Sequence, residues 1–298
     1  MRKTILILIL TISILGLVVL FLRFGIGGDE DTWLCQNGQW VKHGKPLASE
    51  PVRGCGKIET ENIKIDNPES DQIISFPLII KGQARGSWYF EASFPIKLLD
   101  KNQKELAVTI AEAQADWMTN DFVPFKAVIE LSSLPKTSQG TLVLQKDNPS
   151  GLPENDEKII MPIRFPGPDT ITTIKTFFNN SNLDPEFSCN KVFPVERAIS
   201  KTPASARAAL ESLLRGPSFK EQKEGFSTSI NSGVKIQKLA IENGIAKVDF
   251  DSQLEFQVGG SCRVSAIRAQ ITQTLKQFPT VKEVIISING QTEDILQP

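Results

Sequence analysis

Few side chains in this 298-residue sequence have the chemistry that a catalytic site needs. His43 is the one histidine, so it alone would have to act as the base of a serine or cysteine hydrolase. It precedes Gly44 in a segment that predicts a hairpin, and a solvated turn is the more common place for such a residue. The other option is a pair of acids, which can hydrolyse a glycosidic bond when they are suitably separated.

Four acids stand in or beside the recognisable motifs of the chain: Glu91, Asp116, Asp121 and Asp147. We expect Asp116 and Asp121 in a connection between strands, and Asp147 begins an Asp-Asn-Pro turn, where short polar side chains bond the backbone. The sequence therefore predicts no catalytic residues and no enzymatic activity. An envelope hydrolase that uses paired carboxylates is the alternative.

Metal ligation is not expected. The four cysteines include no Cys-x-x-Cys pair, and a single histidine adds little to a zinc site. Asp249 and Asp251 lie at the end of a strand-like segment without an Asp-x-Asp-x-Asp-Gly loop, so outward-facing acids explain them better than a calcium site. The sequence thus predicts neither a metal nor another cofactor.

Two groups of residues are candidates for a binding surface. Trp33 and Trp40 could stack on a ligand, although packing onto their own hairpin is the favoured role. A second candidate precedes a predicted helix, whose exposed N–H groups can hold an anion such as a carboxylate of peptidoglycan. It consists of Gly259, Gly260 and Ser261, for which a turn into the helix is the favoured role.

The amino terminus predicts membrane attachment. Arg2 and Lys3 precede an apolar run from Ile5 to Leu22, long enough to cross a bilayer as a helix. No small-residue cleavage site follows, so we expect an uncleaved anchor over residues 1–28, with a cleaved signal peptide as the alternative. The charges place the amino terminus in the cytoplasm and the bulk of this single-pass protein outside.

The net charge of −1 and the pI near 6.0 give no basic field, which makes nucleic acid an unexpected partner. An exported chain with four cysteines predicts disulfides. Three pairings are possible. Cys35 with Cys55 and Cys189 with Cys262 are favoured because each pair then stays within one predicted module.

Residues 29–59 predict a small stapled hairpin. Asn37-Gly38 is a dipeptide that favours a two-residue type I′ turn, and the resulting register sets Cys35 opposite Trp40 and Leu34 opposite Val41. A hairpin alone is marginal in water, so a disulfide between Cys35 and Cys55 would stabilise it.

Residues 60–167 predict an all-β immunoglobulin-like sandwich. Along one strand, Phe90, Ala92, Phe94, Ile96 and Leu98 alternate with polar residues. Pro77 and Pro95 cannot donate ladder hydrogen bonds, so we place them at edges or bulges. The seven expected strands lie near 63–65, 73–82, 88–99, 106–113, 123–131, 140–145 and 159–165.

This segment resembles the immunoglobulin-like domain of bacterial spore germination proteins. The resemblance rests on Gly86–Pro95, Asp116-Trp117-Met118-Thr119, Asp121–Phe125 and Lys146–Gly151. The family implies no catalytic residues.

Residues 168–298 predict an α+β module in the order strand, helix, strand, strand, helix, strand (βαββαβ), with both helices on one face of a single sheet. Thr202 is the expected N-cap of the first helix, with Pro203 at its first position. The expected strands are 171–178, 234–241, 245–250 and 281–288, and the expected helices run from Pro203 to Leu214 and from Arg263 to Gln277.

This module resembles the GerMN domain of spore germination and sporulation proteins. The resemblance rests on Ala208–Pro217, Gly244–Phe250, Gly259–Val264 and Ile267–Ile271. The resemblance implies self-association or contacts with envelope proteins. We therefore expect a multidomain envelope protein that binds peptidoglycan or partner proteins without catalysis. A receptor for a small extracellular ligand is a further alternative, and it predicts a deep apolar pocket where the sandwich meets the last module.

Overall fold

The computed structural model describes residues 31–36, 39–50, 56–186 and 188–297. It divides into two compact units, Met1–Gly56 and Lys57–Pro298. The predicted anchor, residues 1–28, lies outside the described residues. Within the described part of the chain, no helix is both long and apolar enough to span a membrane.

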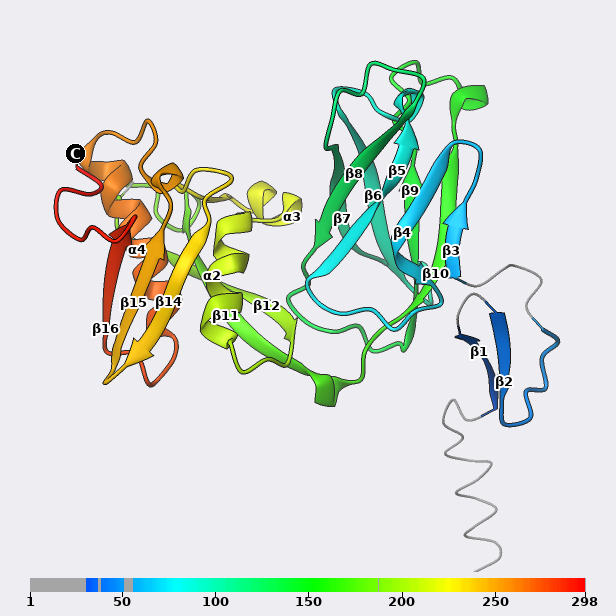
Figure 1. Cartoon of the computed structure of the whole chain (residues 1–298), viewed down its shortest axis with the longest axis horizontal. Coiled ribbons are helices and arrows are strands. Elements are labelled where there is room, and N and C mark those ends of the chain that lie inside the picture. The colour runs from blue at the N-terminus through cyan, green and yellow to red at the C-terminus, as the bar shows by residue number, and fades with distance from the viewer. Residues whose placement is uncertain (1–30, 37–38, 51–55, 187, 298) are drawn as a thin grey trace, which may run out of the picture. The chain divides into compact units, whose positions relative to one another are not determined.

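The first unit contains an antiparallel hairpin, β1 (Thr32–Gln36) and β2 (Gln39–His43) (Figure 1). The predicted register is confirmed, because Cys35 pairs with Trp40 and Leu34 with Val41. The turn residues Asn37 and Gly38 and the partner cysteine Cys55 lie outside the described residues, so the first predicted disulfide remains a prediction.

An eight-stranded antiparallel sheet folds over itself to make the sandwich (Figure 1). Its strand order is β10-β9-β6-β7-β8-β5-β4-β3. The seven predicted strands are present, together with β3. The strands are β3 (Gly56–Glu59), β4 (Ile63–Ser70), β5 (Leu78–Arg85), β6 (Ser93–Asp100), β7 (Glu105–Ala113), β8 (Phe122–Ile129), β9 (Gln139–Gln145) and β10 (Lys158–Arg164).

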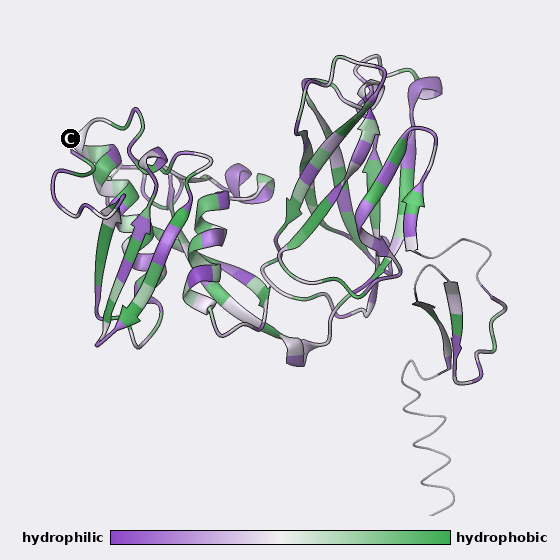
Figure 2. Ribbon diagram, in the orientation of Figure 1, coloured by the Kyte–Doolittle hydropathy of each residue, from purple (hydrophilic) through white to green (hydrophobic). Residues whose placement is uncertain are grey.

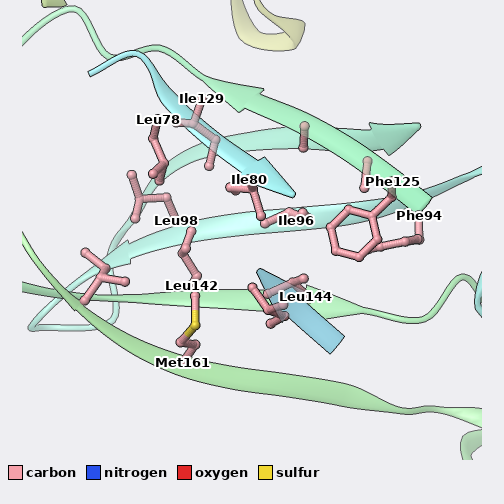
Figure 3. Close-up of a cluster of buried hydrophobic side chains, with 14 of the residues drawn as sticks. Leu78, Ile80, Phe94, Ile96, Leu98, Phe125, Ile129, Leu142, Leu144 and Met161 are labelled. Carbon is pink, nitrogen blue, oxygen red and sulfur yellow. The ribbon is translucent and has the colours of Figure 1, made fainter. Parts of the chain in front are cut away.

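Alternating hydropathy along these strands builds the core (Figure 2). In β5 every second residue is buried, as a strand with one face toward the core requires. Figure 3 shows apolar side chains of β5, β6, β8, β9 and β10 meeting between the layers. Phe94 contributes edge-to-face ring contacts with Trp88, Tyr89 and Phe125.

The predicted strand through Phe90 begins later than expected. Glu91 and Ala92 have positive φ angles, and Phe90 and Ser93 exchange backbone hydrogen bonds across them, so residues 90–93 form a tight turn. Phe90 is consequently exposed, and the buried alternation starts at Phe94. Trp88 is buried in a short 3₁₀ turn, Gly86–Trp88.

The prediction that Pro95 lies at a sheet edge is wrong, because its strand is in the interior of the sheet. Strand β6 is an interior strand between β9 and β7, and Pro95 pairs with Ile110 of β7. Its missing N–H is tolerated because pairing with β9 begins one residue later, at Ile96. Pro77 precedes the first residue of β5.

The carboxyl-terminal module contains the predicted strands and helices plus three further elements. Its elements are β11 (Ile171–Asn180), β12 (Phe193–Ser200), α2 (Ser205–Arg215), α3 (Phe219–Lys223), β13 (Phe226–Ser227), β14 (Ile236–Glu242), β15 (Ile245–Phe250), α4 (Ser261–Lys276) and β16 (Glu283–Ile288). Apolar residues of α2, α4 and the strands β14–β16 share one buried cluster.

The expectation of a single sheet is wrong. The strands form two three-stranded sheets, β12-β11-β13 and β14-β15-β16. Side chains of α4 and the residue after it occupy much of the second edge of β11. Thr274 accepts the Phe177 N–H at 3.1 Å, and Gln277 bonds both the N–H and the C=O of Lys175 at 2.7 and 2.6 Å. These bonds replace the strand neighbour that a continuous sheet would need.

Two local features of this module bear on the predictions. Thr202 is not the N-cap of α2, since the helix starts at Ser205 after Ala204. The Thr202 hydroxyl instead accepts the Ala204 N–H in a turn before the helix.

The predicted disulfide between Cys189 and Cys262 is confirmed, and it joins the loop before β12 to the first turn of α4.

Candidate functional site

Strand β12 joins the carboxyl-terminal module to the sandwich through backbone hydrogen bonds. The Ala198 N–H donates to Leu131 at 2.7 Å, and the Ser200 N–H donates to Phe76 at 2.9 Å. The Ser200 hydroxyl also accepts the Phe76 N–H at 3.1 Å. An edge strand whose polar groups would otherwise be open is thereby covered.

A cluster of ionic side chains lies beside this junction. Arg197 of β12 donates from Nε to Glu130 at 2.9 Å and bonds both carboxylate oxygens of Glu221, with Nη2 at 2.6 Å from Oε2. Glu130 also accepts bonds from Ser212 and Arg215 of α2 at 2.7 and 2.6 Å. We call Glu130, Arg197, Ser212, Arg215 and Glu221 the junction cluster.

Local structure places each member of the junction cluster. Glu130 directly follows β8, and Arg197 occupies a strand position whose side chain is 2% exposed. Glu221 is the third residue of α3, where its carboxylate accepts the Ser218 N–H at 2.7 Å and completes a capping box. The same carboxylate therefore caps one helix and binds the arginine of another element.

The electrostatics of Arg197 favour its charged form. Burial alone would lower the pKa of this guanidinium, but the hydrogen bonds and charges of Glu221 and Glu130 outweigh it and leave the pKa above its ordinary value. Buried ion pairs of this kind add little net stability, yet removal of one partner is costly because the others stay buried and unpaired. The cluster is thus suited to fixing a geometry.

A broad groove runs along the junction, with a volume of about 1600 Å³. One wall is the outer surface of β7 and β8 with residues 130–137, and the other is formed by α2, α3 and residues 233–236. Glu130, Arg215 and Glu221 lie in its lining. The groove therefore uses both modules, and the junction cluster holds its two walls together.

The predicted binding residues lie elsewhere. Trp33 donates from its indole nitrogen to Ala48 at 2.9 Å, with Lys42 over the ring, which supports a packing role within the hairpin. Trp40, on β2, lies on the same face of the hairpin as Trp33. Gly260 has φ of 85° at the N-cap of α4, so this segment makes the turn into the helix. A role of Gly259, Gly260 and Ser261 in binding stays a prediction.

The candidate acids take part in local hydrogen bonds, through the carboxylate in Asp116, Asp249 and Asp251 and through the backbone in Asp121 and Asp147. Asp116 accepts the Met118 N–H at 3.0 Å, the Asp121 carbonyl accepts the Gly86 N–H, and the Asp147 N–H donates to Trp88. Asp249 accepts bonds from Ser287 and Gly290, and Asp251 accepts the Lys235 N–H. Over the described ranges, no three ligating side chains are grouped as a metal site would require.

Sequence reasoning missed the junction cluster. Glu130 and Arg197 are 67 residues apart, and Glu130 and Arg215 are 85 apart, so no spacing in the chain links them. One signal was available. Ser218-x-x-Glu221 is the pattern of a capping box and predicts the start of α3.

Comparison with protein-family models defines the class of both modules. Residues 62–152 match the immunoglobulin-like domain of bacterial spore germination, called Gmad2, and residues 177–294 match the sporulation and spore germination domain called Germane. The chain thus combines two domains of the bacterial sporulation and germination class. It carries a Gmad2 immunoglobulin-like domain followed by a Germane domain, as the sequence motifs predicted.

Three solved structures have recorded similarity to this chain. The first GerMN domain of the sporulation protein GerM from Bacillus subtilis is 20% identical with a TM-score of 0.31, over 41% of this chain and 85% of that one. The tandem GerMN domains of the same protein are 17% identical to this chain with a TM-score of 0.31, over 41% of this chain and 40% of that one. A putative lipoprotein from Clostridium perfringens is 15% identical with a TM-score of 0.27, over 42% of this chain and 80% of that one. No curated protein matches the chain.

Proposed function

We propose that this protein is a non-catalytic binding and assembly module of the cell envelope. Its amino-terminal segment anchors it in the cytoplasmic membrane, and both sporulation-type domains lie outside. The junction groove binds peptidoglycan or an envelope protein, and the Germane domain offers a surface for self-association. The relation of both domains to sporulation and germination proteins supports this reading.

The single observation that carries the proposal is the groove built from both domains and held by the junction cluster. The acids and arginines of the junction cluster neutralise one another beside the groove, where Glu130 is bonded to Arg197 and Arg215. Glu130 is a poor nucleophile in this setting, because each of its carboxylate oxygens already accepts a hydrogen bond from an arginine. The groove therefore suits recognition better than turnover.

The groove also differs from the pocket that a small-ligand receptor predicts. A receptor site is concave, mostly apolar and about 300–1000 Å³ in size. The groove is larger, at about 1600 Å³, and is lined by charged residues along both walls. A macromolecular ligand fits this geometry better than a small molecule.

Three measurements on the full-length protein test the proposal. A carboxyl-terminal tag should be cleaved by protease added outside intact cells. Detergent-solubilised protein should be retained by purified murein sacculi or should sediment as an assembly. A protected tag, or a strictly monomeric protein that does not bind sacculi, would contradict the proposed role.

The hydrolase alternative has its own test. Single replacements of Glu91, Asp116, Asp121 and Asp147 by the corresponding amides would be assayed for muropeptide release from sacculi. A non-catalytic protein releases no muropeptides, so we expect no release above background from the parent protein or from any variant. Release by the parent protein that one replacement abolishes would establish the enzyme instead.

A further inference from the structure

The wall of the junction groove that β7 and β8 form has an apolar centre, which we call the floor, and charged residues line the rest of the groove. Ile110 of β7 faces outward because its neighbour Ala111 is fully buried in the core, and its side chain is 42% exposed. Val108 and Val128 also line the groove, on β7 and on β8. This floor is a patch of branched aliphatic side chains within a sheet face.

Helix α3 places an aromatic side chain on the opposite wall. Phe219 lines the groove and is 51% exposed, with the Lys223 ammonium 4.4 Å from the centre of its ring. Helix α3 is short, but Glu221 fixes it through the capping box and through Arg197. An exposed aromatic on a fixed support resembles the anchors that dominate protein interfaces.

Charge excludes one class of ligand. Basic and acidic side chains line the groove in equal number, and several are already paired, such as Arg215 with Glu130 and Arg207 with Glu211. A polyanion such as a teichoic acid needs an excess of basic groups. A ligand with charges of both signs matches the walls instead.

The floor also disfavours a glycan. Branched aliphatic side chains give no flat ring on which a sugar face can stack, and Phe219 and Phe226 are the aromatic residues in the lining. The backbone groups of β7 are engaged with β6 over most of the strand, so they are not free for sugar hydroxyls. Apolar side chains of a polypeptide fit this floor better.

We propose that the junction groove binds an amphipathic polypeptide segment of a partner protein. The apolar stripe of this segment contacts Ile110, Val128 and Phe219, and its flanking charges of both signs meet the groove walls. This inference rests on the proposed binding function and selects protein over peptidoglycan as the ligand of this site. Segments of this kind bind grooves through apolar anchors at regular spacing.

The test uses two matched isoleucines in the full-length protein in its native membrane. Ile110 lies in the groove, whereas Ile160 of β10 lies outside its lining and is 45% exposed on an outer strand face. A photo-crosslinking phenylalanine analogue would replace each in turn, and adducts would be mapped by mass spectrometry. We expect an adduct at Ile110 with an amphipathic segment of one protein, and none of that protein at Ile160.

A synthetic peptide of the mapped segment then provides the affinity. Ile110→Lys should weaken its binding to the full-length protein at least about tenfold, and Ile160→Lys should change it less than about twofold. Unchanged melting temperatures would show that both variants fold. Adducts with glycan strands, equal adducts at both positions, no adduct at Ile110, or equal affinities would each overturn the inference. If one of these results is found while the protein still binds sacculi, only the inference about the groove fails and the proposed function stands. If the protein does not bind sacculi either, the inference and the proposed function both fail.

Discussion

The guanidinium of Arg197 bonds both carboxylate oxygens of Glu221, and through this pair a sheet strand holds the short helix α3 in place. The same guanidinium reaches Glu130 at the end of β8, so one buried side chain links three elements from two domains. Because Glu221 also caps α3, the position of the groove wall depends on this arginine.

Replacing Arg197 should therefore be costly. Arg197→Met leaves Glu130 and Glu221 buried without one cation, and we expect a loss of about 3–5 kcal/mol in the free energy of unfolding. Urea denaturation would measure it. The control is Arg207→Met, which removes an exposed pair with Glu211 and should cost less than about 1 kcal/mol. Equal losses in both variants would show that the cluster has no special role.

Tyr89 should resist ionisation in the folded protein. It is the only tyrosine, so the ultraviolet absorbance of tyrosinate reports this residue alone. Burial raises the pKa of its phenol, although a backbone hydrogen bond from Ala84 acts in the opposite direction. The phenol donates to the Val123 carbonyl at 2.7 Å. A raised folded pKa means that the stability contribution of this group is complete below about pH 10 and is lost as the pH rises further.

An absorbance titration checks this directly. We expect the tyrosinate signal to appear only well above pH 10, or together with unfolding seen by circular dichroism. Tyr89→Phe should lower stability at neutral pH by about 1–3 kcal/mol, because the Val123 carbonyl loses its partner. The deficit of this variant should shrink as the pH rises above 10. A phenol that titrates near pH 10 in folded protein would refute the prediction.

The Cys189–Cys262 disulfide should stabilise the Germane domain. It closes a loop with a sequence separation of 73 residues, and bonds of this kind contribute about 2–4 kcal/mol. The double variant Cys189→Ala, Cys262→Ala should show this loss in urea denaturation. A reductant should destabilise the parent protein and leave the Cys189/Cys262 variant less affected, whereas identical sensitivity would place the effect at other cysteines.

Gly86 should not tolerate a side chain. A Cβ at this position would lie 1.9 Å from the Thr119 carbonyl oxygen and 2.4 Å from that of Trp117, both of them backbone atoms. Gly86→Ala should therefore cost about 1–3 kcal/mol or more by displacing this connection. Gly167→Ala is the matched control, since no atom lies within 4 Å of its added Cβ. Similar melting temperatures for the two variants would contradict the packing shown here.

Much of the fold follows from short-range patterns in the sequence. The alternation from Phe94 to Leu98 placed β6, and Asn37-Gly38 fixed a hairpin register that the pairing of Cys35 with Trp40 confirms. The prediction failed where a turn interrupted the period, as at Glu91 and Ala92. It failed again where α4 side chains replaced a strand, as Thr274 and Gln277 do beside β11.

By itself, the sequence determined most of the strands, the two longer helices and the two domain classes, because these depend on neighbours within a few residues and on motifs that are continuous in the chain. The tertiary structure alone decided that Glu130, Arg197 and Glu221 meet and that a groove with Ile110 in its floor lies beside them. The physical reason is that a charged side chain can pair with any opposite charge, and only the packing of two domains brings these particular partners within hydrogen-bond distance.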